Sequence, residues 1–212
     1  FNDCSFDGTK AYFGAGVSMT YAAKLCGEKG LSGIEFCYGI PGNIGGGIFM
    51  NAGAYGGEIS QNIVYVKYLD ENGDPQTICK ADCNFSYRHS CFMEKKQFIL
   101  GAEFELTPKP KDEIISFMED IMKRRIEKQP LDKPSAGSSF KRPEGYFAAA
   151  LIDECGLKGK SIGGASVSEK HAGFIVNNGG ATCRDIVRLA DLVSDTVYKE
   201  KGVRIEKEMI IV

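Results

Sequence analysis

The sequence predicts an α+β protein built from two units, and two observations support that fold class. Short segments with strand-like alternation dominate the first half of the chain, whereas helices with one apolar face dominate the second half. The pattern changes near Pro108 and Pro110, so we expect a first domain over 1–108 and a second over 109–212. A chain of 212 residues with 43% apolar residues is long enough to fill two modest cores.

The first unit is expected to hold one helix and several strands. Met19, Ala22, Ala23 and Cys26 recur at helical spacing, and a glycine follows, so we expect a helix over 18–29. An Asn-Gly pair at positions 72 and 73 is a strong hairpin signal between two alternating segments. The expected strands, in chain order, are 10–19 (a short strand and its turn), 63–70, 76–81 and 97–106.

The second unit is expected to hold three helices and a terminal strand. Thr182 with Asp185 three residues later is the signature of a capping box, which predicts where the last helix begins. The expected helices are 111–129, 145–154 and 184–199, and the strand is 203–212. The first of these helices is expected to bury one face, made of Ile114, Phe117, Met118, Ile121 and Met122.

Composition excludes several functional classes. The net charge of -2 and the lack of a basic run argue against nucleic acid, and no segment is long and apolar enough to span a membrane. Eight cysteines include no CxxC pair, so we expect reduced thiols rather than a disulfide framework. With two histidines and no paired cysteine motif, no metal site is expected.

The stretch GIPGNIGGGIFMNAGAYGGEI, residues 39–59, is the strongest candidate for a ligand site. Glycines at many of its positions would let backbone N–H groups approach a phosphate or a flat ring. The pattern lacks the Lys-Ser/Thr ending of a P-loop, and it is not the GxGxxG turn that opens a helix. Tight turns between strands are the competing interpretation, but so many glycines favour a ligand, with a pyrophosphate-bearing cofactor as the expected class.

Three further stretches carry residues suited to chemistry. Small residues around Ser138 in PSAGSSFKRP would leave its hydroxyl accessible, either as a proton donor or nucleophile or as part of an ordinary loop. Arg88, within NFSYRHSCF, is either part of a core ion pair or an anion ligand. Glu206 and Glu208 share one face of the expected terminal strand, and taken alone that face is expected to be solvated.

Taken together, five stretches resemble the family of UDP-N-acetylenolpyruvoylglucosamine reductase, in their order and spacing. They are GIPGNIGGGIFMNAGAYGGEI, YRHSCF, QPLDKPSAGSSFKRP, GGASVSEKHAGFIVN and IEKE. The resemblance runs from about Ala11 to the C-terminus and is closest to the shorter subtype. It implies an incomplete FAD-binding domain of the vanillyl-alcohol-oxidase type, shortened at its N-terminus, followed by an α+β substrate-binding domain to whose active site the terminal strand returns.

The resemblance also implies an activity and the residues that carry it. FAD would transfer hydride from NADPH to UDP-N-acetylglucosamine enolpyruvate, giving UDP-N-acetylmuramate for peptidoglycan in the cytoplasm, with the enzyme a monomer. The implied catalytic residues are Arg88, Ser138 and Glu208, and the implied substrate contacts are Tyr55, Tyr87, Lys141 and Arg142. The implied FAD contacts are Gly39, Ile40, Pro41, Gly42, Ile44, Gly45, Gly46, Asn51, Ala52 and Gly53.

Two alternative functions remain beside this one. The chain could be another flavin oxidoreductase of the same fold, acting on an alcohol or hydroxy acid. It could also be a flavin-free, inactive fragment that binds a UDP-sugar. The pairing of SAGSSFKRP with IEKE favours the enolpyruvyl reductase, because an alcohol oxidase has no need of a serine that protonates carbon.

Overall fold

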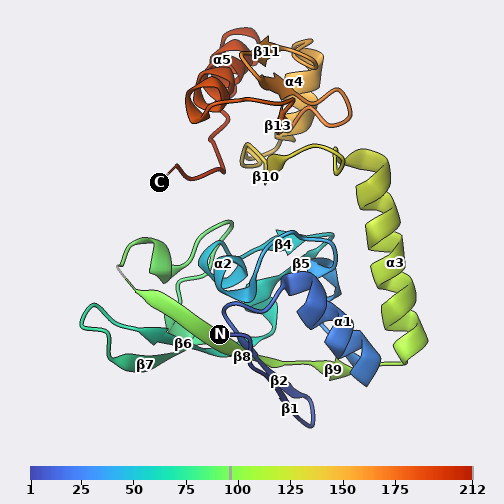
Figure 1. Cartoon of the computed structure of the whole chain (residues 1–212), viewed down its shortest axis with the longest axis vertical. Helices are drawn as coiled ribbons and strands as arrows, with labels where there is room; N and C mark the ends of the chain where they lie inside the picture. Colours follow the sequence, from blue (N-terminus) through green and yellow to red (C-terminus); the bar gives the residue numbers. More distant parts are fainter. Residues whose placement is uncertain (96, 212) are drawn as a thin grey trace. The chain divides into compact units, whose positions relative to one another are not determined.

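The computed structural model describes residues 1–95 and 97–211, and the chain forms two compact units, Phe1–Lys123 and Arg124–Val212. The division falls inside helix α3 (Lys111–Lys128), which matches the helix expected over 111–129 (Figure 1). Its buried apolar residues are Ile114, Met118 and Ile121, as predicted from the apolar spacing, and Arg125 is buried as well. Phe117 was wrongly placed on that face, because its side chain is 45% exposed.

The first unit is organised around a five-stranded antiparallel sheet with the order β1-β2-β8-β6-β7. The hairpin between β6 and β7 is confirmed, and Gly73 takes a φ of 85° in its turn. The first strand was not expected, and it forms a second hairpin through the turn at Gly8. The strands are β1 (Cys4–Asp7), β2 (Lys10–Gly14), β6 (Ile63–Leu69), β7 (Pro75–Cys79) and β8 (Phe98–Glu105).

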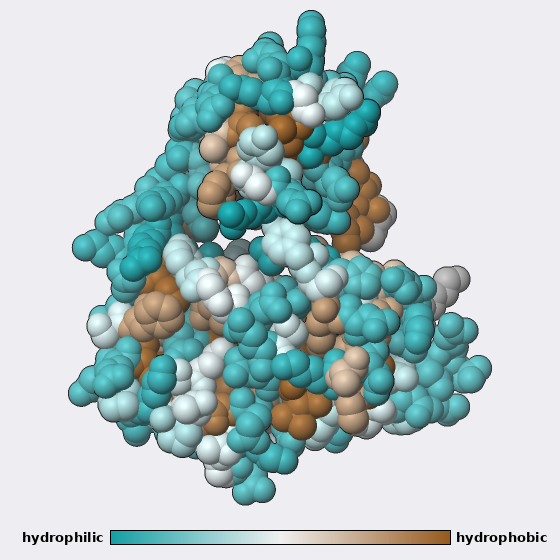
Figure 2. Space-filling view, turned by 180° about the vertical axis from the view of Figure 1, so that it is seen from behind, coloured by the Kyte–Doolittle hydropathy of each residue, from teal (hydrophilic) through white to brown (hydrophobic). Residues whose placement is uncertain are grey.

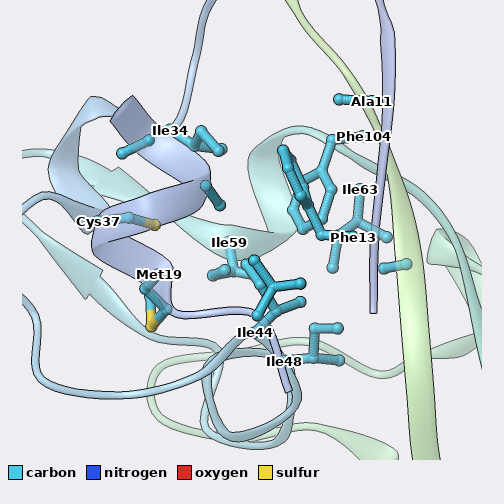
Figure 3. Close-up of a cluster of buried hydrophobic side chains, with 14 of the residues drawn as sticks. Ala11, Phe13, Met19, Ile34, Cys37, Ile44, Ile48, Ile59, Ile63 and Phe104 are labelled. Carbon is cyan, nitrogen blue, oxygen red and sulfur yellow. The ribbon is translucent and has the colours of Figure 1, made fainter. Parts of the chain in front are cut away.

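Two helices cover this sheet. Helix α1 (Met19–Lys29) ends at Gly30 with a φ of 72°, as the sequence predicted. Helix α2 (Ile44–Phe49) lies inside the glycine-rich stretch, where no helix was expected. Figure 3 shows Ile44 and Ile48 of this short helix among the buried side chains around Phe13 and Phe104. Packing of these two isoleucines therefore stabilises a helix that three glycines would disfavour.

Short elements complete the first unit. A two-stranded pair joins β3 to β9, and a tight hairpin joins β4 to β5 within the glycine-rich stretch. These strands are β3 (Leu31–Ser32), β4 (Gly53–Ala54), β5 (Gly57–Glu58) and β9 (Thr107–Pro108). Single turns of 3-10 helix lie at η1 (Glu35–Cys37), η2 (Ile59–Gln61), η3 (Lys80–Asp82) and η4 (Cys91–Met93).

The second unit packs two helices with a four-stranded sheet of order β10-β13-β12-β11. The capping box at Thr182 is confirmed, since its hydroxyl accepts the N–H of Asp185 and the Asp185 carboxylate accepts the N–H of Thr182. The elements are β10 (Ser135–Ser138), α4 (Ala148–Glu154), β11 (Ser161–Ile162), β12 (Ala165–Val167), β13 (Phe174–Asn177) and α5 (Cys183–Lys201).

Two predictions for the second unit were wrong. Helix α4 begins three residues later than expected, because Gly145 takes a φ of 74° in a turn. The strand expected over 203–212 is absent from the described residues, which form one bridge there, between Lys207 and Phe140. On the side toward Arg204 the pairing does not continue, because Pro143 has no N–H to donate. Residue 212, the last of that expected strand, lies outside the described residues.

Figure 2 shows a face that is mostly hydrophilic, with the apolar residues in separate patches. No helix of the described chain is long and apolar enough to cross a membrane.

We expect stability to fall in mild acid because of His171. Burial lowers the pKa of this imidazole from 6.5, and the positive charge of Lys158 acts in the same direction. Below pH 6.5 the unfolded chain therefore takes up the proton first, and unfolding becomes easier as the pH falls further. The measurement is the melting temperature between pH 5 and pH 7.5. The His171→Gln variant should show a flatter curve than wild type, whereas parallel curves would contradict the assignment.

Candidate functional site

Asn51 joins the glycine-rich stretch to the loop that contains Arg88. Its side chain is 0% exposed, and its amide is used at both ends. The Oδ1 atom accepts the N–H of Ser60 at 3.0 Å, and the Nδ2 atom donates to the carbonyl of Ser86 at 2.9 Å. A buried amide with both ends paired fixes the two segments in one geometry. Asn51 thus acts on this site by positioning.

Arg88 makes a second link between the same two segments. It lies at the tip of a tight turn in which Ser86 and His89 exchange backbone hydrogen bonds. Its Nη2 atom donates to the carbonyl of Gly53 at 3.0 Å, and its guanidinium lies 5.0 Å from the centroid of the Tyr87 ring. A third link comes from the Ser90 hydroxyl, which donates to the Phe49 carbonyl at 2.7 Å. The guanidinium is therefore held beside the glycine-rich hairpin.

Backbone strain concentrates in these two segments. The described non-glycine residues with positive φ are Asn51 (41°), Tyr55 (51°), Asn84 (49°) and Arg88 (54°). Tyr55 and Gly56 occupy the two-residue turn between β4 and β5, where both positions need positive φ. Positive φ costs a bulky L-residue roughly 1–2 kcal/mol. Such strain at Tyr55 and Arg88 indicates that these side chains are kept for a reason other than stability.

Half of the eight glycines in the stretch are explained by close packing inside the protein. A Cβ at Gly45 would lie 2.9 Å from the Cβ of Ala15, and one at Gly57 would lie 2.4 Å from the Phe36 ring. Gly47 and Gly53 are similarly enclosed. The number of glycines was the reason to expect a ligand site in residues 39–59. Because packing explains several of them, that number alone is weaker support for such a site.

Gly42 and Gly46 have no such internal reason. Both are exposed, and a Cβ at Gly46 would meet no atom within 4 Å, while one at Gly42 would be in ordinary contact with Met19 at 3.8 Å. No backbone carbonyl of the described residues accepts the N–H of Gly46. Bare backbone at the start of helix α2, with an open donor, fits a flat or phosphate-bearing cofactor.

The other predicted cofactor residues divide into backbone and core positions. Gly39 has a φ of 81° and donates its N–H to the Thr20 hydroxyl at 3.0 Å. Ile44 is fully buried in the core, so its side chain cannot line a ligand. Pro41 is exposed next to Gly42, while Ile40 and Ala52 are partly buried against the core.

In the second unit the structure brings Ser138 and Glu208 into one strip. The N–H of Glu208 donates to the carbonyl of Ser139, and the N–H of Lys141 donates to the carbonyl of Glu206, at 2.9 and 2.8 Å. Ser138 is exposed, as its small neighbours predicted, and its hydroxyl donates to the carbonyl of Phe140 at 3.2 Å. This pairing takes the place of the expected terminal strand.

Charged side chains flank this strip. The Lys141 ammonium lies 3.3 Å from the Glu206 carboxylate. The Arg142 guanidinium lies 4.0 Å from the centroid of the Phe147 ring, and its Nε donates to the Tyr146 carbonyl at 3.3 Å. Phe147 is 61% exposed and was not predicted as part of the site.

Sequence reasoning also missed Ser139. Its side chain is buried, and its hydroxyl accepts the N–H of Ile175 while its carbonyl accepts that of Glu208. The serine therefore fixes the strip that presents Ser138. The only available signal was the doubled serine in SAGSSF, which does not say which of the two is buried.

Comparisons with known proteins match both parts of the chain to described families. Residues 1–78 match the family described as FAD binding domain, which makes the first unit part of a flavin-binding fold. Residues 129–212 match the family described as UDP-N-acetylenolpyruvoylglucosamine reductase, C-terminal domain. The predicted α+β fold, with a FAD domain followed by a second domain, is confirmed.

Individual relatives then give the family. The chain is 50% identical to the UDP-N-acetylenolpyruvoylglucosamine reductase of Agathobacter rectalis, over 92% of this chain and 62% of that protein. It is 47% identical to that of Caldanaerobacter subterraneus, over 97% and 68%. The crystal structure of the Thermus caldophilus reductase matches with a TM-score of 0.85 and 33% identity, over 97% and 73%. The chain belongs to the UDP-N-acetylenolpyruvoylglucosamine reductase family and spans about two thirds of these relatives' length.

The exposed backbone at Gly42 and Gly46 is the proposed cofactor cradle, and exposed Gly46 with enclosed Gly47 makes a matched pair of positions for testing it. Gly46→Ala should raise the free energy of unfolding by about 0.5–1 kcal/mol, since alanine favours a helix, but should weaken FAD binding several-fold. Gly47→Ala should lower stability instead, because its Cβ would lie 3.0 Å from the Met19 sulfur. Thermal unfolding and a fluorescence titration with FAD measure both effects. Unchanged FAD affinity in Gly46→Ala would exclude this surface as the cradle.

Strain at Arg88 predicts an inverted order of stability. Arg88→Gly should be more stable than Arg88→Ala by about 1 kcal/mol, because only glycine adopts positive φ without cost. Both variants lose the same hydrogen bond to Gly53. Urea denaturation measures the difference, and exposed Arg188 in the interior of helix α5 is the control position, where alanine should be the more stable by about 1 kcal/mol. If Arg88→Ala proved more stable than Arg88→Gly, the inferred backbone strain at Arg88 would be refuted.

Proposed function

We propose that this chain carries the flavin and substrate sites of an NADPH-dependent reductase that converts UDP-N-acetylglucosamine enolpyruvate to UDP-N-acetylmuramate for peptidoglycan. Family membership supports the reaction. The observation that carries the proposal is the guanidinium of Arg88 held against the glycine-rich hairpin by its bond to Gly53. That contact joins the expected charge-stabilising group to the expected flavin cradle.

The first unit would hold the cofactor through its backbone. Gly42 and Gly46 offer open main chain on the surface, and the other predicted positions (Gly39, Ile40, Pro41, Ile44, Gly45, Asn51, Ala52 and Gly53) shape the segment that presents it. Bound FAD would supply hydride transfer from NADPH to the enolpyruvyl C3 of the substrate. We assign this part to residues 1–108 and the substrate-binding part to residues 109–212.

Arg88 would stabilise the negative charge that develops on the substrate. Hydride addition at C3 leaves charge at C2 and in the adjacent carboxylate, giving an enolate-like intermediate. A guanidinium already held by Gly53 and stacked by Tyr87 needs no reorganisation as that charge appears. Tyr55, fixed on the same hairpin, would contact the substrate from the turn.

Ser138 would deliver the proton that completes the reduction at C2. Its hydroxyl is exposed, and its present acceptor is a backbone carbonyl at 3.2 Å, so a rotation about χ1 frees the proton. Glu208 runs beside it on the paired segment and would hold a water that donates a hydrogen bond to the substrate carboxylate. Lys141 and Arg142 supply positive charge within four residues of the serine, which suits contacts to the diphosphate.

Separate half-reactions test the role of Ser138. Ser138→Ala should leave flavin reduction by NADPH unchanged and slow flavin reoxidation by the enolpyruvyl substrate about 10²–10⁴-fold, the usual contribution of a general acid. Stopped-flow absorbance of the flavin follows both steps. Ser135→Ala, on the same exposed strand, is the matched control and should leave both rates near wild type. Equal loss in both half-reactions would refute the assignment.

Simple measurements separate the alternatives. A colourless protein that still binds UDP would favour the flavin-free fragment. A yellow protein that oxidises NADPH only when the enolpyruvyl substrate is present supports the proposed reductase. A yellow protein that instead oxidises an alcohol or hydroxy acid would favour the other flavin class. Size-exclusion chromatography checks the expected monomer, and cell fractionation checks the expected cytoplasmic location.

A further inference from the structure

The loop that presents Arg88 is closed at its base by two cysteines. Cys83 precedes this loop, residues 84–90, and Cys91 follows it. The N–H of Cys91 donates to the carbonyl of Cys83 at 2.8 Å. A backbone contact of this kind brings the two Cα atoms to roughly 5–6 Å, which is the separation found in disulfides.

Both thiols lie inside the protein. Cys83 and Cys91 are 0% and 3% exposed and belong to the same buried cluster, and the nearness of Cys91 adds to the raised pKa of Cys83. Both are free thiols in the structure. Cys79 lies nearby but is exposed, and it offers Cys83 only its backbone carbonyl, at 3.3 Å from the Cys83 sulfur.

We propose that Cys83 and Cys91 form a redox-modification site, at which a peroxide joins them in a disulfide that locks the base of the Arg88 loop. The proposal rests on the backbone contact, the burial of both thiols and the position of the pair on either side of one loop. It does not depend on the reaction proposed above.

The oxidation balances with hydrogen peroxide as the oxidant. The Cys91 thiolate attacks one peroxide oxygen, which breaks the O–O bond and gives a sulfenic acid and one water. The Cys83 sulfur then attacks the sulfenic sulfur, and the second oxygen leaves as water. Two thiols and one peroxide thus become one disulfide and two waters.

Cys91 is the better candidate for the first attack. Burial raises the pKa of Cys83 to about 12. Burial also raises the pKa of Cys91, but the positive charge of Lys95 opposes that rise. Since the thiolate is the reactive form, both raised pKa values make the reaction slow. The pair is therefore expected to respond to sustained oxidation rather than to a brief pulse.

A disulfide here would restrain the segment that carries the guanidinium. It would close a loop of nine residues, from Cys83 to Cys91, which removes conformations from the unfolded chain. Because the backbone contact between Cys83 and Cys91 already closes the base of the loop, we expect the disulfide to form without moving Arg88. The melting temperature should rise by about 5 °C on oxidation and return to its starting value with reductant.

Trypsin gives a direct test on the wild-type protein. Cleavage after Lys80, Arg88 and Lys95 places Cys83 in ADCNFSYR and Cys91 in HSCFMEK, so that a disulfide between them joins two separate peptides. The folded protein is treated with hydrogen peroxide, blocked with an alkylating agent and digested without reductant. The expected result is the linked pair of peptides by mass spectrometry, and its loss on reduction.

Cysteine-to-serine variants distinguish the pair of Cys83 and Cys91 from nearby Cys79. In Cys83→Ser, dimedone should label Cys91, and the linked peptides should be absent. Cys79→Ser should still give them in full. The proposal is overturned if Cys83 and Cys91 stay reduced while exposed Cys79 is oxidised, if Cys83 instead links to Cys79, or if oxidation lowers the melting temperature. The wild-type digest keeps the test valid even where a buried serine impairs folding.

Discussion

The buried amide of Asn51 is the constraint on which the first unit's site depends. One end of this amide holds Ser60, just past the glycine-rich hairpin, and the other holds Ser86, in the loop that contains Arg88. Loss of either partner would leave a polar group unpaired in the core, which costs about 1–3 kcal/mol. The amide therefore permits only one arrangement of the two segments. The Arg88 and Ser90 bonds then depend on this arrangement, because each joins the same two segments.

Around the glycine-rich stretch, burial stabilises helix α2, whereas the nearby turns carry backbone strain. Helix α2 is poor in intrinsic helix formers, and Ile44 and Ile48 hold it in place by burial. The tight turns at Tyr55 and Arg88 instead hold large side chains where glycine would be easier. The packed core thus supports strained turns at its surface, and the side chains of Tyr55 and Arg88, which suit binding or catalysis, lie on those turns.

Sequence patterns predicted the elements whose signals are local. The helix ending at Gly30, the Asn72-Gly73 hairpin and the Thr182 capping box depend on residues close in sequence, and each was found. The stretches bearing the candidate site were also recognisable, because unusual glycine and charge patterns mark them. The errors came where distant partners decide. Helix α2 forms because its isoleucines enter a core that the local sequence does not describe. The terminal segment meets Phe140 at one bridge and forms no strand in the described residues. Likewise, nothing in the sequence could show that Gly46 is open while Gly47 is enclosed.

The pairing of β2 with β8 has a consequence for how the first unit reaches its folded state. Ala11 pairs with Phe104, 93 positions further along the chain (104 minus 11). Both strands lie inside the sheet, so the sheet stays divided until β8 has been synthesised. Until then the apolar face of α2 lacks its partner on β8, and the edges of β2 and β6 stay open. Such an interval of exposed apolar surface is when aggregation competes with folding. The yield of soluble protein should therefore depend on synthesis rate and temperature more than the stability of the finished fold suggests.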